Sequence, residues 1–216
     1  SVLPYEVEAT RPDFSLWPRW DKSMGFTTRG CVRRCPFCVV PRKEGMIRAV
    51  GDIYSFWHGG GDERLMLLDN NLTALPGHFE LVVGQLIKER VKVDFSQGLD
   101  IRLLTLEMAR QLAQVRLWKR IHFAWDDVGI EQSVRLGVDT LKRGGVSLHN
   151  VTFYVLIGFN STLEEDLYRV ETLRGLGVNP FVMPFDKQDR YQRRFARWVN
   201  HKAIFKTVPW EEYRAS

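Results

Sequence analysis

The chain has 216 residues, of which 44% are hydrophobic and 26% are charged, a composition typical of a globular protein with a buried core. It has neither an apolar run near the roughly 20 residues that cross a bilayer nor a secretory signal, so we expect a cytoplasmic protein without membrane contact. The formal net charge is +5, and residues 186–206 carry all of that excess, with seven basic and two acidic side chains. Any argument for an anionic partner therefore rests on that segment.

Three ranges make up the predicted domain organisation. Residues 1–22 contain three prolines and two tryptophans without a helical period, and we interpret them as an extended strap. Residues 23–185 alternate between strand and helix patterns and form the predicted core. Residues 186–216 form a basic, amphipathic C-terminal segment.

Six apolar or alternating runs in the core predict strands. They are Met24–Arg29, Arg64–Asp69, Val91–Phe95, Arg120–Trp125, Val151–Gly158 and Pro180–Phe185. Helical patterns separate them, and this alternation implies a parallel sheet with crossover connections. Gly144 and Gly145 predict the end of one helix, and Ser161 with Glu164 predicts a capping box at the start of the next.

All the cysteines of the chain, Cys31, Cys35 and Cys38, lie within eight residues. Their odd number argues against a disulfide framework, and a zinc site closed by protein or a ferredoxin-type cluster needs a fourth ligand. His58 is a possible fourth zinc ligand, which we favour less. Three thiolates suit a 4Fe–4S cluster in which one iron has no protein ligand and can chelate an amino acid.

The spacing Cys-x₃-Cys-x₂-Cys, with Phe37 before the last cysteine and a predicted strand before the first, resembles the signature of the radical S-adenosylmethionine (radical SAM) enzymes. The resemblance covers residues 23–185 and implies an α/β fold, a six-stranded parallel partial TIM-type barrel, here with an N-terminal strap and a C-terminal helix. It also implies that the three cysteines ligate a 4Fe–4S cluster, that SAM binds at the carboxyl ends of the strands, and that a reductant such as flavodoxin or ferredoxin is a partner.

The resemblance assigns a role to residues after the second strand. Asp69 and Asn70 stand where the family commonly has a Gly-Gly-Glu-like motif that receives the methionine amine of SAM. An Asx turn is the structural alternative for these two residues. The run Gly59–Glu63 precedes the strand, at the wrong end, and we interpret it as a turn.

The later strand ends supply the other predicted SAM contacts. Gln97 and Asp126 are candidates for the ribose hydroxyls, and Arg102 for the carboxylate, with helix caps or surface charges as alternatives. Residues expected around adenine are Phe37, Ile157, Gly158 and Met183. Gly158 could instead be a glycine that only the turn requires.

The C-terminal segment has two faces at helical spacing. The basic face holds Arg190, Arg193, Arg194 and Arg197, and the apolar face holds Tyr191, Phe195, Trp198 and Val199. Such a helix could bind a nucleic-acid backbone. A helix that docks by its aromatic face and leaves its arginines solvated is more common, and we favour that interpretation.

The predicted function is that of a radical SAM enzyme, which cleaves SAM reductively to a 5′-deoxyadenosyl radical that acts on an unidentified substrate. No side chain is expected to act as acid or base in that cleavage. The alternative is a non-catalytic iron–sulfur or zinc protein that binds nucleic acid through the basic helix. Such a protein would have no use for polar residues at successive strand ends.

Overall fold

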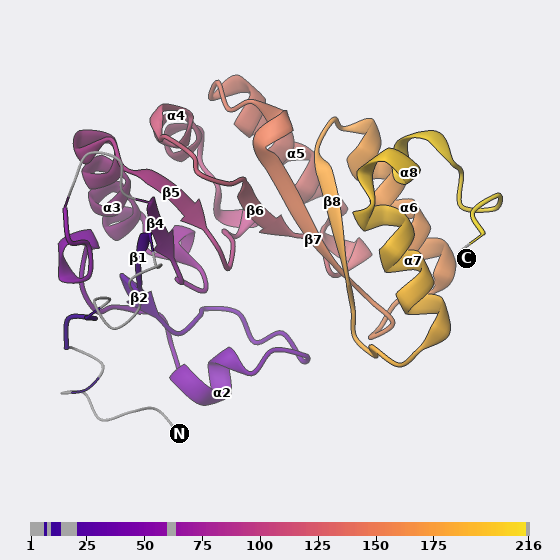
Figure 1. Cartoon of the computed structure of the whole chain (residues 1–216), viewed down its shortest axis with the longest axis horizontal. Helices are drawn as coiled ribbons and strands as arrows, with labels where there is room; N and C mark the ends of the chain where they lie inside the picture. The colour runs from indigo at the N-terminus through magenta and orange to yellow at the C-terminus, as the bar shows by residue number, and fades with distance from the viewer. Residues whose placement is uncertain (1–6, 8–9, 14–20, 60–63, 215–216) are drawn as a thin grey trace.

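Two parallel three-stranded sheets form the core of the structure, a computed structural model that describes residues 7, 10–13, 21–59 and 64–214 (Figure 1). The first sheet has the order β1-β4-β5, with the strands Lys22–Gly25, Arg64–Leu67 and Lys92–Phe95. The second has the order β6-β7-β8, with the strands Ile121–Ala124, Val151–Ile157 and Asn179–Pro184. The structure is therefore α/β with parallel sheets.

A few backbone contacts join the two sheets between β5 and the chain that enters β6. Val93 forms a parallel bridge with Leu117, and the amide of Trp118 donates to the carbonyl of Val93 at 2.8 Å. The amide of Leu99 donates to the carbonyl of His122 at 2.7 Å. The two sheets are thus neighbours, but the described strands form two separate ladders of three, so a single six-stranded partial barrel stays a prediction.

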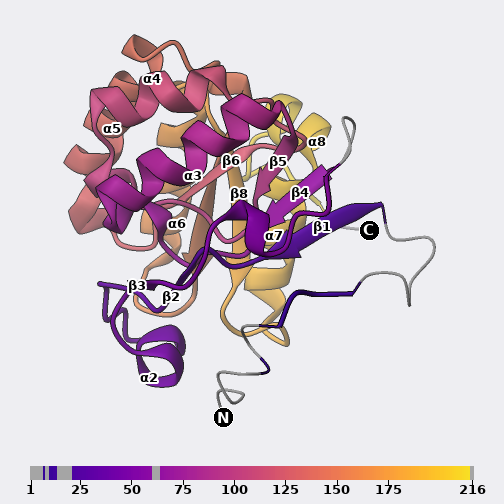
Figure 2. The same cartoon turned by 90° about the vertical axis from the view of Figure 1, so that its left-hand side faces the viewer.

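Four helices alternate with the strands: α3 Pro76–Glu89, α4 Leu106–Gln114, α5 Glu131–Arg143 and α6 Leu163–Gly175. Figure 2 shows α3, α4 and α5 grouped on one side of the strands. Short 3₁₀ turns lie at Ile53–Ser55, Leu72–Ala74, Ile101–Leu103, Val128–Ile130 and Leu148–Asn150. Apolar residues at helical spacing, such as Phe79, Val83 and Leu86, are fully buried, and each such burial contributes about 1.5–3 kcal/mol.

The first predicted strand, Met24–Arg29, is broken in the structure. The chain leaves the first sheet after Gly25, and β2 Thr28–Arg29 pairs antiparallel with β3 Arg48–Ala49. Between them lie the cysteines and α2 Val40–Glu44, set apart from the α3–α5 group in Figure 2. The prediction of one continuous strand was wrong because the carboxylate of Asp69 accepts from the amides of Thr27 and Thr28, where the chain turns out of the first sheet.

The predicted capping box at Ser161 is wrong by one residue. Thr162 is the N-cap of α6, and its hydroxyl accepts from the amide of Glu165, whose side chain accepts from the amide of Thr162. The Ser161 hydroxyl instead donates to Asp166 at 2.6 Å. The helix end at Gly144 is confirmed, since α5 ends at Arg143 and Gly145 has a φ of +89°.

The C-terminal segment forms α7 Arg190–Asn200 and α8 Lys202–Thr207. The apolar face of α7 packs inward, with Phe195, Trp198 and Val199 fully buried. Within the described ranges, no helix combines the length and apolar character that a membrane crossing needs.

Most of the predicted strap and of the Gly59–Glu63 run lies outside the described residues. Of the strap, Arg11 donates to the carbonyl of Trp57 at 2.6 Å, and the carbonyl of Pro12 lies 3.0 Å from Nε2 of His58. Arg11 and Pro12 thus contact the chain before β4. The strap itself stays a prediction.

Candidate functional site

The three cysteines lie in the loop between β2 and α2, which we call the cysteine loop (residues 30–39). All three are half-buried free thiols. Burial raises the pKa of the Cys35 thiol, the charge of Arg102 opposes that rise, and Cys38, Asp126 and Cys31 add to it. The three thiols, Arg102 and Asp126 therefore share one electrostatic environment.

Glycine is required at Gly30, where the cysteine loop begins. Its φ is +82°, and a Cβ there would overlap the backbone of Met46. Its amide donates to Oε2 of Glu44 at 3.0 Å, and Glu44 also pairs with Arg29 at 3.3 Å. Asn70, one of the predicted SAM contacts, donates to the same Glu44 oxygen at 3.1 Å. Glu44 thus ties the start of the loop to the end of β4.

Asp69, two residues after the end of β4, fixes the chain where it leaves the first sheet for the cysteine loop. Its Oδ1 accepts from the amide and hydroxyl of Thr27, at 3.0 and 2.8 Å, and from the amide and the hydroxyl of Thr28. The side chain is buried, and burial raises the pKa of this carboxyl group. Its second oxygen, Oδ2, is buried without a hydrogen-bond partner among the described residues.

Asp100, which follows β5, joins two arginines at the site. Arg102 forms a two-point ion pair with it, with Nε 2.7 Å from Oδ1 and Nη2 3.0 Å from Oδ2, and Nε of Arg33 lies 2.7 Å from Oδ2. Burial alone would raise the pKa of Asp100, but the bonds from Arg102 and Arg33 hold that pKa below its ordinary value. Because Arg33 belongs to the cysteine loop, Asp100 holds that loop against the end of β5.

Two donors point at the sulfur of Cys31. The amide of Arg33 lies 3.4 Å from Sγ, and Nδ2 of Asn71 lies 3.7 Å from it. Asn71 also donates to Oδ2 of Asp100 at 3.5 Å. Glu44, Asn71, Asp100 and Arg33 were not among the predicted site residues. For Asp100 a signal existed, because it stands in the polar run after the third predicted strand.

The predicted ribose contacts differ in their surroundings. Asp126, after β6, is half-buried and accepts from the amide of Leu156 in β7 at 2.8 Å. Burial raises the pKa of its carboxyl group, which lies near enough to Cys35 to raise that thiol's pKa. Gln97 is exposed. The structure therefore places Asp126 beside the cysteine loop. For Gln97, a role at the site stays a prediction.

Aromatic rings connect the cysteine loop with the ends of β7 and β8. The ring of Phe37 packs edge-on against Phe159 at 5.6 Å between centroids, and Phe159 packs against Phe185 at 4.9 Å. Met183 in β8 is partly exposed, whereas the side chain of Ile157 is fully buried in the core. Of these predicted adenine contacts, Phe37 and Met183 offer accessible surface, whereas Ile157 offers none, and its carbonyl accepts from the amide of Phe185 at 3.1 Å.

Packing within the protein is enough to explain why residue 158 is a glycine. Its φ is +75°, and a Cβ there would overlap the side-chain amide of Gln192 from α7. That amide is held in place, because Oε1 of Gln192 accepts from the amide of Asp186 at 2.9 Å. The close approach that requires glycine is therefore made by Gln192, and a contact with adenine stays a prediction.

Replacing Gly158 with alanine should destabilise the protein by about 1–3 kcal/mol, because the residue would be strained and would displace Gln192. Gly84 in the middle of α3 is the matched control, since a Cβ there meets nothing within 4 Å and Gly84→Ala should stabilise by about 0.5–1 kcal/mol. Urea unfolding of both variants measures the difference. Equal stabilities would contradict the packing described for Gly158.

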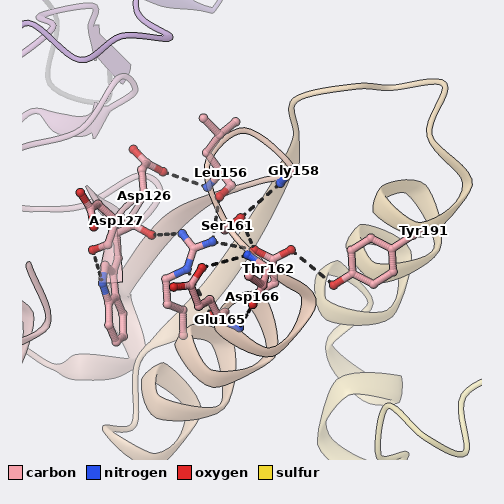
Figure 3. A network of polar contacts seen from close by, with 11 residues as sticks. Asp126, Asp127, Leu156, Gly158, Ser161, Thr162, Glu165, Asp166 and Tyr191 are labelled. Carbon is pink, nitrogen blue, oxygen red and sulfur yellow. Dashed lines mark hydrogen bonds and ion pairs between the residues drawn. The ribbon is translucent and has the colours of Figure 1, made fainter. Parts of the chain in front are cut away.

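A buried network fixes the ends of β6 and β7 beside the site (Figure 3). The fully buried guanidinium of Arg169 donates to Asp166 at 2.7 Å, to the carbonyl of Trp125 at 2.8 Å and to the carbonyl of Leu156 at 3.0 Å. Asp166 also accepts from the hydroxyl of Tyr191 in α7 at 3.3 Å. Burial, followed by the charge of Asp166, raises the pKa of Tyr191. The network thus joins both strand ends to the C-terminal segment.

Among the described residues, no three His, Cys, Asp or Glu side chains gather closely enough to ligate one metal ion together. Thiolates that hold a four-iron cluster each bind a different iron, so they need not meet at one point. His58, the possible fourth zinc ligand, lies with its ring nitrogen at the carbonyl of Pro12. Cluster ligation by the three cysteines therefore stays a prediction at this point.

No known protein-family model matches the chain. Curated proteins named ribosomal protein uS12 methylthiotransferase RimO are similar to it. The protein of Psychrobacter sp. (strain PRwf-1) is 23% identical over 125 residues, which are 55% of this chain and 22% of the relative. That of Nitrosomonas europaea is 27% identical over 114 residues, 50% of this chain and 23% of the relative. That of Saccharophagus degradans is 28% identical over 100 residues, 45% of this chain and 19% of the relative.

These matches share one pattern. The aligned region takes up about half of this chain and spans only about a fifth to a quarter of the relatives' length. The chain is therefore a distant relative, at low identity, of proteins named as methylthiotransferases.

Proposed function

We propose that this chain is the core of a radical SAM enzyme that holds a 4Fe–4S cluster through Cys31, Cys35 and Cys38. The observation that supports this function most directly is that strand ends meet the cysteine loop. Asn71 after β4 and Asp100 after β5 reach Cys31 and Arg33, and Asp126 after β6 lies near Cys35. The similarity to RimO proteins, which are radical SAM enzymes, supports the same class.

The residues of the cysteine loop fit a cluster. Burial raises the pKa of the Cys35 thiol, and the charge of Arg102 acts against that rise, toward the thiolate form that binds iron. The amide of Arg33 and Nδ2 of Asn71 donate toward the sulfur of Cys31. Hydrogen bonds to ligating sulfurs are among the features that set the reduction potential of a cluster. When bound, the cluster supplies the electron that cleaves SAM to methionine and a 5′-deoxyadenosyl radical.

The neighbouring side chains suit the groups of SAM. The unpartnered Oδ2 of Asp69 is a buried acceptor for the ammonium, with Asn70 beside it. Two of the nitrogens of Arg102 bind Asp100, so its remaining N–H donors can pair with the carboxylate. Asp126 and Gln97 are the proposed ribose contacts, and Phe37, Ile157, Gly158 and Met183 the proposed surroundings of adenine.

The rest of the proposal concerns the frame and the partners. We take the six parallel strands as a partial barrel that positions the cofactor and excludes water, and a flavodoxin or ferredoxin as the electron donor. We expect this chemistry in the cytoplasm. The relatives match over a small part of their length, so the proposal includes neither their methylthio transfer nor a ribosomal substrate.

Anaerobic reconstitution should load about four iron and four sulfide per chain, the content of a 4Fe–4S cluster. With dithionite as reductant, the loaded protein should convert SAM to 5′-deoxyadenosine, which chromatography with mass detection measures. Protein incubated with SAM and dithionite but without iron is the control. Bound zinc in place of iron, or a loaded cluster that leaves SAM intact, would contradict the proposed function.

Replacing Asp69 with asparagine should weaken SAM binding by roughly 10- to 100-fold, because a lost charge-assisted hydrogen bond costs about 1.5–3 kcal/mol. Iron content should stay unchanged, since an asparagine oxygen can still accept from Thr27 and Thr28. Asp94→Asn, which removes another buried carboxylate from β5, is the matched control. Titration calorimetry with SAM tests both variants, and equal affinities would place the ammonium elsewhere.

A further inference from the structure

The C-terminal segment has a concave surface that neither the cluster nor SAM uses. A hollow of about 940 Å³ is lined by Arg190, Tyr191, Arg193, Arg194, Arg197 and Arg214. Five of these six residues are arginines and none is acidic. We call this surface the arginine hollow.

The fold assembles the arginine hollow from two parts of the sequence. Helix α7 contributes four arginines from one side, while Phe195 and Trp198 on its other side are buried in the core. The chain after α8 then turns back, with Trp210 packed against Phe195 at 5.0 Å, and this return brings Arg214 to the helix. Sequence spacing alone predicted the basic face of the helix but not the fifth arginine.

Two arginines of the hollow are held in position. The guanidinium of Arg194 lies 4.5 Å from the ring centre of Trp210 and donates to the carbonyl of Tyr213. Arg214 in turn donates to the carbonyl of Glu211 at 2.7 Å. These contacts to rings and neutral carbonyls orient the guanidinium groups without cancelling their charge.

The two aspartates just before α7 bind backbone amides and not the arginines of the hollow. Asp189 accepts from the amide of Gln192 as the N-cap of α7, and Asp186 accepts from the amide of Gln188. Within the described ranges, Arg190, Arg193 and Arg214 form no ion pair with a carboxylate. Like charges gathered around one hollow repel each other, and a bound anion relieves that repulsion.

We infer that the arginine hollow binds the phosphate backbone of a nucleic acid strand, an activity that goes beyond the proposed function and does not depend on it. Guanidinium groups match phosphate oxygens as two-point donors. From Arg190 to Arg197 the helix rises about 10 Å, a length over which one DNA strand carries about three phosphates.

The lining also favours nucleic acid over an acidic protein. Protein interfaces have an apolar centre, whereas protein–nucleic acid interfaces are more polar and more positive. Among the described residues that line the hollow, Tyr191 contributes the one aromatic ring. The lining of the hollow is therefore better suited to the phosphate backbone of a nucleic acid than to an acidic protein.

The test compares the full chain with the triple variant Arg190→Gln, Arg193→Gln, Arg197→Gln. Arg194 is kept because it holds the Tyr213 carbonyl. The probe is a labelled 20-nucleotide oligouridylate, titrated at several potassium chloride concentrations. The triple variant should bind it more than tenfold more weakly at 100 mM salt, and its logarithmic salt slope should be smaller by about 2–3, since each lost phosphate contact removes about 0.7–0.9.

The matched control removes the same charge from the exposed faces of α4 and α5, with Arg110→Gln, Arg135→Gln and Arg143→Gln. It should bind the probe as the unchanged protein does, and circular dichroism checks the fold of both variants. A second variant with lysine at the three hollow positions should keep the salt slope and lose affinity, because charge remains but the two-point geometry is lost.

DNA of the same length should bind as RNA does, because phosphates are shared by both. The inference is overturned if the control variant loses as much affinity as the triple variant. It is overturned equally if binding is independent of salt, or if polyglutamate displaces the probe at equal charge. The assay needs no cluster, so its failure would leave the proposed function standing, and failure of SAM cleavage would leave this inference standing.

Discussion

Replacing Cys35 with alanine should abolish cluster binding. Three thiolates hold three irons of the proposed 4Fe–4S cluster, and two cannot retain it against loss. After anaerobic reconstitution, iron and sulfide should fall from about four each per chain to near zero, and the visible absorbance of the cluster should disappear. The same result is expected for Cys31→Ala and Cys38→Ala.

Val39→Ala is the matched control for this experiment. Val39 directly follows Cys38 and is exposed, so its truncation should leave both iron content and folding unchanged. Far-ultraviolet circular dichroism of each variant separates loss of ligand from loss of fold. A Cys35→Ala protein with full iron content and unchanged absorbance would show that the ligand assignment is wrong.

Replacing Arg169 with methionine should destabilise the protein by about 3–5 kcal/mol, the cost of breaking a buried ion pair by removing one partner. The variant leaves the carboxylate of Asp166 and the carbonyls of Trp125 and Leu156 without their buried donor. Methionine is similar in length to arginine and fills much of the same space. The loss of stability therefore measures the missing polar contacts more than a cavity left in the core. Urea unfolding measures the change.

Arg143→Met is the control for that substitution. Its pair with Asp139 is exposed on α5, with nitrogen and oxygen 3.7 Å apart, and such pairs contribute about 0–1 kcal/mol. If the two variants had equal stabilities, Arg169 would not have the central role that its contacts indicate.

Local patterns predicted the regular elements well where the chain is periodic. The strand predicted at Val151–Gly158 is β7 Val151–Ile157, because a short and mostly apolar run predicts a buried strand, and five of its seven residues are buried. The antiparallel pair β2–β3 could not be predicted in this way. Two-residue strands about twenty positions apart have no period, and Asp69, forty residues further on, turns the chain at Thr27. The predicted capping box was one residue too early because Ser161 with Glu164 and Thr162 with Glu165 fit the same sequence pattern.

The site was predictable in the same uneven way. Cysteine spacing identified the candidate ligands, since all three belong to one short loop. The polar contacts around them depend on long-range pairs, such as Arg33 with Asp100, which are 67 positions apart. No local pattern marks Glu44, whose carboxylate is useful only because folding brings Gly30 and Asn70 to it. Side chains at strand ends are therefore visible in the sequence as candidates, whereas their partners are not.

The contacts on the cysteine loop bear on how the proposed cluster would be held. Asp69 holds the chain before the loop, Glu44 holds Gly30, and Asp100 holds Arg33. Fixing one residue's backbone costs roughly 1–2 kcal/mol, and these side-chain contacts offset part of that cost for the loop. In zinc fingers the metal supplies this order, because the chain is unfolded until the metal binds. In the proposed enzyme, the protein's own side chains would share that task with the cluster, so a substitution at Glu44 or Asp100 should weaken cluster retention although neither residue is a ligand.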